Sequence, residues 1–452
     1  MDPFFISDEP VFSSRAPGRL DVMGGIADYS GALVLQLPLD RATTASLQRQ
    51  PAPRCDVATR RGDGWSTFSI ELRDLLHGPL ADPHALGAWF SARREDHWAA
   101  YVIGVVQYCL LRAKRSTSQA LQGLRIRIES NVPEGKGVSS SAAIEVATMM
   151  VVAPNSGLDL SGEQIATACQ WVENHVVGAP CGIMDQMTSV CGKRDRLLRL
   201  RCQPGNIEGY TAIPAGYRFY GIDSGVRHAV TGADYGTVRT AAFMGYRMIA
   251  DAAGLPATLD GDRVLIDDPE WNGYLTNIGT AAFEGRFANR LPERMSGDEF
   301  LTRFHGTTDS VTRVERGRTY PVRQATAHPI YEQARVDRFS NLLGALAERG
   351  TREAEELGRL MYESHASYNA CGLGSDATDR LVRMVEDAGP SSGLFGAKIT
   401  GGGSGGTVAI LGTVAAEARV REIASRYASE TGRSIEVFAE SGPGAMEVGV
   451  TT

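Results

Sequence analysis

The sequence predicts a globular protein that mixes α-helices and β-strands, organised as two domains or as one large two-lobed unit. Its 452 residues are enough to bury a substantial core in each of two lobes. Segments that alternate apolar and polar residues, as half-buried strands do, occur beside segments with helical periodicity. Two glycine-rich stretches, near residues 135 and 403, adjoin strand-like segments and predict tight loops there.

Composition and charge argue against several classes of protein. The chain is 43% hydrophobic and 22% charged, and its net charge of −7 disfavours a nucleic-acid binder held by bulk charge. No apolar run is long enough to cross a membrane, and no signal peptide is visible. The seven scattered cysteines form no C-x-x-C pair, which favours a reduced protein. We therefore expect a cytoplasmic monomer that binds neither nucleic acid nor membrane.

The first motif covers residues 14–31, where a proline, four glycines and two arginines predict a loop. A buried strand is expected directly after it, over 32–37. Arg19, Asp21 and Asp28 are then charges held between strands, where an unpaired charge is costly. A structural Arg–Asp pair that ties down the loop is one interpretation, and a polar binding site is the other.

The second motif is a loop between a strand expected over 124–129 and a helix that begins near Ala142; a helix is also expected over 85–111. Glycine adopts the positive φ that turns several backbone N–H groups toward one point, and the helix start adds unpaired donors. A serine-capped helix is the alternative interpretation, but the combined glycines and serines favour phosphate binding. The expected phosphate-binding residues are Pro133, Gly135, Lys136, Gly137, Ser139, Ser140 and Ser141.

Two helices are expected in the next part of the chain. Ser161 and Gln164 have the spacing of a capping box and predict a helix start, and that helix carries Glu173. After a glycine-containing turn, a second helical segment begins near residue 183. Asp185 is in its first turn, where a capping role is the local alternative to a chemical one.

The second half of the chain predicts a strand over 217–222 and a helix from about 232 to 253 that carries Tyr235 near its start. Residues 256–295 read as irregular. Four more helices are expected, over 298–305, 330–349, 352–368 and 375–388.

The third motif, Gly401–Gly406, satisfies G-x-G-x-x-G, but a β-branched strand over 407–411 follows it instead of a helix. A dinucleotide-binding fingerprint requires the helix, so the sequence disfavours a Rossmann fold. No Walker A sequence occurs, which excludes a P-loop NTPase. The motif therefore predicts a tight loop whose backbone comes close to another loop or to a ligand.

The three motifs, in this order, resemble those of the GHMP small-molecule kinases, over Ala16–Leu20, Pro133–Ala143 and Gly396–Gly406. The resemblance covers nearly the whole chain. It implies an α+β, two-lobed GHMP kinase fold, with an N-terminal lobe like domain 2 of ribosomal protein S5 (left-handed βαβ crossover) and a ferredoxin-like C-terminal lobe. We expect these lobes over 1–215 and 216–452, with ATP and the active site in the cleft between them.

Within that family the chain is similar to the galactokinase branch, because residues 172–187 read V-E-N-H-V-V-G-A-P-C-G-I-M-D-Q-M. The similarity implies Asp185 as the catalytic base or the orienter of the sugar's anomeric hydroxyl group, with Arg19 as the adjacent positive charge. It implies Mg²⁺ held by Glu173 and by Ser141 or Ser140. The residues implied to hold the sugar are Asp28, Gly182 and Tyr235, and those implied to approach ATP include Gly402 and Gly403.

One departure from that branch concerns the sugar. Galactokinases carry Glu-His where this chain has Gly25 and Ile26, and those two side chains address the hydroxyl group on C6. A hydroxymethyl group docked here would lose its partners, and sites lacking such partners favour a sugar without the group. L-Arabinopyranose is the sugar that otherwise has the galactose stereochemistry, and the chain also resembles the kinase region of plant L-arabinokinases.

The expected activity is therefore ATP-dependent phosphorylation of L-arabinose at its anomeric hydroxyl group, giving β-L-arabinose 1-phosphate. Two alternatives remain open at the level of the sequence. One is a galactokinase, or a kinase of another C6-altered sugar such as galacturonate. The other is a non-catalytic sugar sensor. The intact serines Ser139–Ser141 disfavour this alternative.

Overall fold

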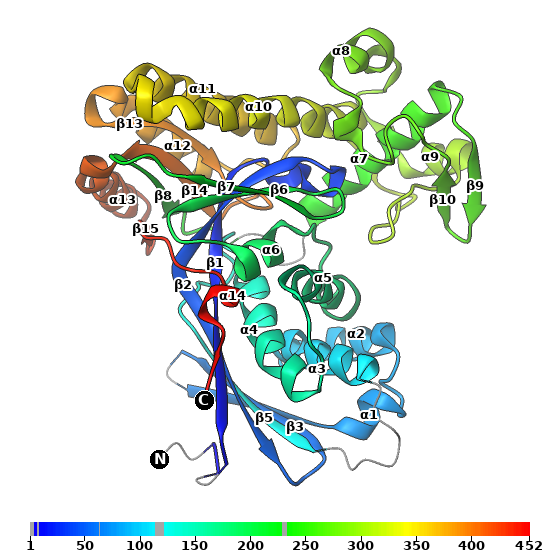
Figure 1. Cartoon of the computed structure of the whole chain (residues 1–452). Helices are drawn as coiled ribbons and strands as arrows, with labels where there is room; N and C mark the ends of the chain where they lie inside the picture. Colours follow the sequence, from blue (N-terminus) through cyan, green and yellow to red (C-terminus); the bar gives the residue numbers. More distant parts are fainter. Residues whose placement is uncertain (1–3, 7–8, 63, 114–121, 228–232) are drawn as a thin grey trace.

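Two β-sheets, each covered by helices, form most of the protein (Figure 1). The structure is a computed structural model, and it describes residues 4–6, 9–62, 64–113, 122–227 and 233–452. The first sheet has the order β16-β1-β2-β5-β3-β4, and β6 and β7 continue it from β2. Its strands are β1 (Val11–Met23), β2 (Leu33–Gln50), β3 (Arg54–Arg61), β4 (Gly64–Glu71), β5 (Gly123–Ser130), β6 (Arg196–Arg201), β7 (Asn206–Ala212) and β16 (Val450–Thr451).

The strand β2 connects the parts of the first sheet, because it pairs with β1, β5 and β6. Its residues 33–36 pair with β6, its residues 43–50 pair with β5, and β1 pairs along most of its other edge. The expected loop over 14–31 is therefore wrong up to Met23, because this stretch is the strand β1. Register shifts near Pro17 and beyond Asp21 accommodate the proline and glycine within the pairing. The chain leaves the sheet only at the 3-10 helix η1 (Gly25–Ser30).

Helices cover one face of the first sheet (Figure 1) and bury the largest apolar core against it. The helix expected over 85–111 is two helices, because the exposed charged segment 93–96 supplies no apolar residue to continue the buried stripe. The capping box of Ser161 and Gln164 is confirmed. The elements here are α1 (Leu72–Leu76), α2 (Pro83–Ser91), η2 (His97–Ala99), α3 (Ala100–Arg112), α4 (Ser140–Asn155), α5 (Gly162–Val172), η3 (Glu173–Val177) and α6 (Met184–Cys191).

The second sheet is antiparallel throughout and has the order β13-β14-β8-β15. The helix expected over 330–349 begins earlier, and Pro329 lies inside it. The expected start of another helix at residue 232 lies outside the described residues. The elements of this part are β8 (Tyr217–Asp223), α7 (Ala233–Ala252), α10 (Val322–Arg349), α11 (Thr351–Ala370), α12 (Asp376–Ala388), η7 (Pro390–Ser392), β13 (Leu394–Ile399), β14 (Thr407–Thr413), η8 (Val414–Ala416), α13 (Glu417–Thr431) and β15 (Val437–Phe438).

The region between α7 and α10 is more regular than the sequence indicates. Residues 256–295 were expected to be irregular, yet two four-residue strands form a hairpin there, too short for a period-2 pattern to stand out. The elements are β9 (Ala257–Asp260), β10 (Arg263–Ile266), η4 (Leu275–Asn277), α8 (Thr280–Ala282), η5 (Phe283–Phe287), η6 (Ala288–Arg290), β11 (Met295–Ser296), α9 (Gly297–Phe304) and β12 (Thr319–Tyr320).

A shared apolar core joins the two sheets. It contains Leu20 and Leu35 from the first sheet, Phe219 from the second, and Phe339 and Met361 from α10 and α11. The C-terminal residues return to the first sheet, where the short helix α14 (Ala445–Val448) precedes β16 and its pairing with β1. Among the described residues, no helix is both long and apolar enough to span a membrane.

Candidate active site

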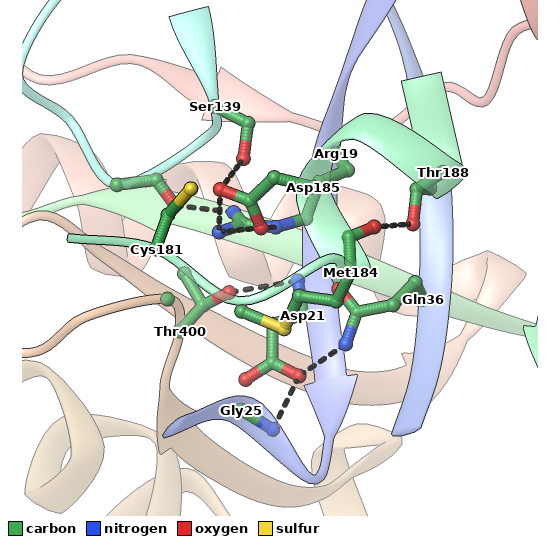
Figure 2. Close-up of polar contacts among 12 residues, drawn as sticks. Arg19, Asp21, Gly25, Gln36, Ser139, Cys181, Met184, Asp185, Thr188 and Thr400 are labelled. Carbon is green, nitrogen blue, oxygen red and sulfur yellow. Dashed lines mark hydrogen bonds and ion pairs between the residues drawn. The ribbon is translucent and has the colours of Figure 1, made fainter. Parts of the chain in front are cut away.

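The carboxylate of Asp185 is held from two sides (Figure 2). Arg19 Nε donates to Asp185 Oδ1 at 2.9 Å and Arg19 Nη2 to Oδ2 at 3.1 Å, while Ser139 Oγ donates to Oδ2 at 2.6 Å. Arg19 is buried, whereas the Asp185 side chain keeps 22% of its surface exposed. The carboxylate thus engages a strand and the residue before another helix instead of capping its own helix, and the partner of Arg19 is neither Asp21 nor Asp28.

The elements that carry these three residues explain the geometry. Arg19 lies on β1, Asp185 in the first turn of α6, and Ser139 immediately before α4. Ser139 has φ +60, in the left-handed region, and its side chain makes no capping hydrogen bond. The serine-cap interpretation is therefore wrong for Ser139, whose hydroxyl group is turned to Asp185.

The second and third motifs pack against each other through their backbones. Thr407 Oγ1 donates to the Lys136 carbonyl at 2.8 Å, and Arg19 Nη1 donates to the Gly137 carbonyl at 2.7 Å. A Cβ at Gly401 would stand 2.9 Å from the Gly137 carbonyl oxygen, which is too close for a side chain. The close approach expected for Gly401–Gly406 is thus made to another loop.

The remaining residues of the expected phosphate site lie around this junction. The Lys136 ammonium group forms an ion pair with buried Asp223 at 2.7 Å. Ser140 and Ser141 form the start of α4, and Gly135 and Gly137 have φ +71, as the expected turn requires. Gly403 packs its backbone against Leu373.

Two buried glutamates lie beside the start of α4. Burial, with Asp185 nearby, raises the pKa of Glu173 to about 7, and hydrogen bonds from Ser141, Cys181 and Gln186 oppose that rise. Burial and then the charge of Glu173 raise the pKa of Glu145 well above its usual range. Gln186 Nε2 donates to Glu173 at 2.6 Å. Sequence reasoning missed Glu145, although it follows Ser141 by four residues on one helix and so shares its face.

These oxygens suit a magnesium ion. Mg²⁺ prefers carboxylate and hydroxyl oxygens and uses one or two carboxylates together with substrate phosphates. Glu173 and Ser141 supply such donors, and Glu145 Oε1 has no hydrogen-bond partner within the described chain. Throughout the described residues, no group of three or more His, Cys, Asp or Glu side chains could hold a metal by itself.

The expected sugar residues also come together. Asp28 is buried; burial and then the charge of Asp185 raise its pKa to about 7, which Arg239 opposes. Asp28 Oδ1 accepts from its neighbour's backbone, Tyr29 N–H, at 2.7 Å. A Cβ at Gly182 would overlap the Asp28 carboxylate, so only glycine fits there. Tyr235 stacks edge-on against Tyr29, with ring centroids 5.8 Å apart.

Arg239 and Asp309 support this site and were not found from the sequence. Arg239 forms a buried two-point ion pair with Asp309, at 2.9 and 2.8 Å, and donates to the Cys181 carbonyl at 3.0 Å. It therefore anchors the turn that contains Gly182. The spacing of Tyr235 and Arg239, one helical turn apart, was the available signal, but the partner Asp309 is distant in sequence.

The pair Gly25 and Ile26 lies in η1 and is fully buried. Gly25 N–H donates to Asp21 Oδ1 at 3.1 Å, and Ile26 N–H donates to the Tyr368 hydroxyl group at 2.9 Å. Asp21 forms a buried ion pair with Lys398 at 2.7 Å. Tyr368 and Lys398 were not expected from the sequence, because Tyr368 lies outside the three motifs and the prediction for the third motif concerned only its glycines.

Three parts of the chain match domains of one kinase family. Residues 100–193 match the GHMP kinases N terminal domain, residues 342–430 match the GHMP kinases C terminal domain, and residues 4–49 match the galactokinase galactose-binding signature.

The chain is also similar to curated enzymes along most of its length. It is 39% identical to L-arabinokinase of Arabidopsis thaliana, over 98% of this chain and 47% of that one. It thus spans about half the length of the plant enzyme. It is 28% identical to galactokinase of Chloroflexus aurantiacus, over 96% of this chain and 92% of that one.

Solved structures show the same fold at low identity. Lactococcus lactis galactokinase complexed with galactose superposes with a TM-score of 0.72 at 18% identity, covering 99% of this chain and 96% of that one. Methanococcus jannaschii mevalonate kinase superposes with a TM-score of 0.56 at 14% identity, covering 96% and 98%.

Proposed function

Because the chain belongs to the GHMP kinases and is a sugar kinase of the galactokinase and L-arabinokinase type, we propose that it transfers the γ-phosphoryl group of ATP to the anomeric hydroxyl group of L-arabinose. The product is β-L-arabinose 1-phosphate. The observation that carries the choice of sugar is Gly25 and Ile26, which stand where a galactokinase has its Glu-His pair.

The sugar lies between Asp28, the backbone of Gly182 and the ring of Tyr235. Asp28 accepts hydrogen bonds from ring hydroxyl groups, and the backbone of Gly182 packs directly beside its carboxylate. At the C5 end of the ring, buried Ile26 offers no polar side chain. A pentopyranose has no hydroxymethyl group there and so loses no hydrogen bond on binding. A hexopyranose would bury its C6 hydroxyl group without a partner.

Asp185 holds the anomeric hydroxyl group in line with the phosphate and accepts its proton. Arg19 keeps the carboxylate oriented through its two hydrogen bonds. Phosphoryl transfer proceeds through a loose transition state, so positioning and charge neutralisation supply most of the catalysis. Ser139 adds a third hydrogen bond to the same carboxylate.

The phosphates of ATP lie at the loop Pro133–Ser141, against its backbone N–H groups from Glu134 onward, and at the start of α4, under the loop Gly401–Gly406. The contacts between these two loops support a shared phosphate site. Glu173 and Ser141 hold Mg²⁺, which neutralises phosphate charge when bound. The site then lies between an N-terminal lobe over 1–215 and a C-terminal lobe over 216–452.

The function is tested by steady-state assays with ATP, Mg²⁺ and a panel of L-arabinose, D-galactose, D-galacturonate and D-fucose. We expect kcat/KM to be highest for L-arabinose, with phosphorylation at the anomeric position located by ³¹P and ¹H NMR of the product. A higher kcat/KM for D-galactose would instead identify a galactokinase. Sugar binding without any turnover would support the sensor alternative.

A further inference from the structure

The space beside Gly25 is already filled by another side chain. Gly25 has φ +39, and a Cβ there would overlap the hydroxyl oxygen of Tyr368 and stand 2.9 Å from Tyr368 Cζ. It would also stand 2.8 Å from Asp21 Oδ2. These separations are below any ordinary van der Waals contact. While Tyr368 keeps this position, residue 25 has to be glycine.

The Tyr368 hydroxyl group also forms hydrogen bonds with two backbone groups next to Gly25 and in the third motif. It accepts a hydrogen bond from Ile26 N–H at 2.9 Å and donates one to the Gly401 carbonyl at 3.1 Å. A hydroxyl group can donate one hydrogen bond and accept another, so these two contacts satisfy the Tyr368 hydroxyl group. Neither backbone group is then free to bind a hydroxyl group of a sugar.

The Tyr368 ring is fixed from behind. His328 packs edge-on against it, with ring centroids 5.3 Å apart, and Lys398 Nζ lies 5.2 Å from its centroid. Lys398 is held by Asp21, which also accepts from Gln36 and from Gly25 N–H (Figure 2). Tyr368, Asp21 and Lys398 are all completely buried. The ring is therefore enclosed by buried side chains.

We infer that Tyr368 is a specificity-determining residue: its hydroxyl group takes the volume and both hydrogen-bonding groups that the C6 hydroxyl group of a hexopyranose would need. This inference rests on the proposed function, with C5 of the sugar directed to Gly25 and Ile26. It also predicts that exchanging Gly25 and Ile26 for the Glu-His of galactokinases is insufficient while Tyr368 remains.

The test compares kcat/KM for D-galactose and L-arabinose in the unsubstituted protein and in Tyr368→Phe. The variant keeps the ring and frees Ile26 N–H and the Gly401 carbonyl. We expect the galactose-to-arabinose ratio to rise about five- to tenfold, roughly the effect of one neutral hydrogen bond, through a lower KM for galactose. D-Fucose has no C6 hydroxyl group, so its ratio to arabinose should rise less.

Tyr320→Phe is the matched control. Tyr320 is equally buried, and its hydroxyl group also accepts a backbone hydrogen bond, from Glu315 N–H at 2.8 Å, in the pair β11–β12. This control should leave the ratio unchanged. A second variant, Tyr368→Leu, removes the aromatic ring together with the hydroxyl group.

An unchanged ratio in whichever Tyr368 variant is folded by circular dichroism would overturn the inference, and so would failure of both variants to fold, because Tyr368 would then be structural only. A preference of the unsubstituted protein for galactose is a different result. It would contradict the proposed function itself, so the two failures are distinguishable.

Discussion

At the scale of single residues, the site depends on one carboxylate held by groups from distant parts of the chain. Asp185 is bound by Arg19, 166 residues earlier, and by Ser139, 46 residues earlier. Its orientation is therefore set by tertiary contacts and not by its place in a helix. A carboxamide of the same shape keeps the packing but cannot accept a proton.

Asp185→Asn is expected to lower kcat by roughly 10²- to 10⁴-fold, the usual contribution of a positioned proton acceptor. Binding of L-arabinose, measured by isothermal titration calorimetry, should remain detectable. Asp262→Asn is the control, because that exposed carboxylate pairs with Arg313 at the surface. Substantial residual turnover in Asp185→Asn would remove Asp185 from the chemistry.

The buried Asp28 makes stability depend on pH. Its pKa is raised from 3.8 to about 7, mainly by burial. Below about pH 4 the group is protonated in both the folded and unfolded chain. Between about pH 4 and 7 the unfolded chain binds fewer protons, so the free energy of unfolding falls as the pH rises, by up to about 4 kcal/mol from this group.

We therefore expect Asp28→Asn to reduce the decline in melting temperature between pH 5 and pH 8, measured without ligands by differential scanning fluorimetry. Asp251→Asn, at an exposed position on α7, should keep the decline of the unsubstituted protein. If the melting temperature of Asp28→Asn declined as much as that of the unsubstituted protein, the ionised form of Asp28 would not be disfavoured in the folded state.

At the scale of elements, the proposed phosphate site is formed by two loops that contact each other. The loop after β5 and the loop between β13 and β14 meet at Gly137 and Gly401, backbone to backbone. Gly401 has φ +67 and lies against both the Gly137 carbonyl and the guanidinium group of Arg19. A side chain there would displace both partners at once.

Gly401→Ala is expected to raise KM for ATP and to lower kcat, so that kcat/KM for ATP falls about tenfold or more. The affinity for the sugar should change little. The cost has two sources, strain at positive φ and the close contacts. Gly432→Ala separates them, because Gly432 has φ +66 and no atom within 4 Å of its Cβ position. Equal kinetics in the two variants would contradict a role for the loop contact.

At the scale of the whole molecule, a buried ion pair connects the two sheets. Asp21 belongs to β1 of the first sheet and Lys398 to β13 of the second, and both side chains are completely buried. The Asp21 carboxylate also accepts a hydrogen bond from Gly25 N–H, which connects the pair to the proposed sugar site. It couples the relative position of the sheets to the geometry at Gly25.

Lys398→Met should destabilise the protein by about 3–5 kcal/mol, because it leaves Asp21 charged, buried and without its cation. Asp21→Asn combined with Lys398→Met should cost less, since no unpaired charge remains. Urea unfolding monitored by circular dichroism measures both. The exposed pair of Arg380 and Glu430 provides the control, and Arg380→Met should leave the unfolding midpoint unchanged.

The sequence alone determined the three motifs, most helices and the family, and it predicted the candidate site residues Arg19, Asp28, Glu173 and Asp185. These follow from short-range patterns, because glycine, serine and helical periodicity act within a few residues of one another. The strand β1 was read as a loop because its proline and glycines are tolerated only through bulges and pairing with β2.

Only the tertiary structure decided what stands around those residues. Ser139 was expected at phosphate but donates to Asp185. Tyr368 and Lys398 contact η1 and β1, beside the proposed sugar site, from positions more than 340 residues later in the chain. Such contacts leave no local pattern, since a buried tyrosine reads as core wherever it occurs. Their partners are chosen by packing, which acts across the fold and not along the chain.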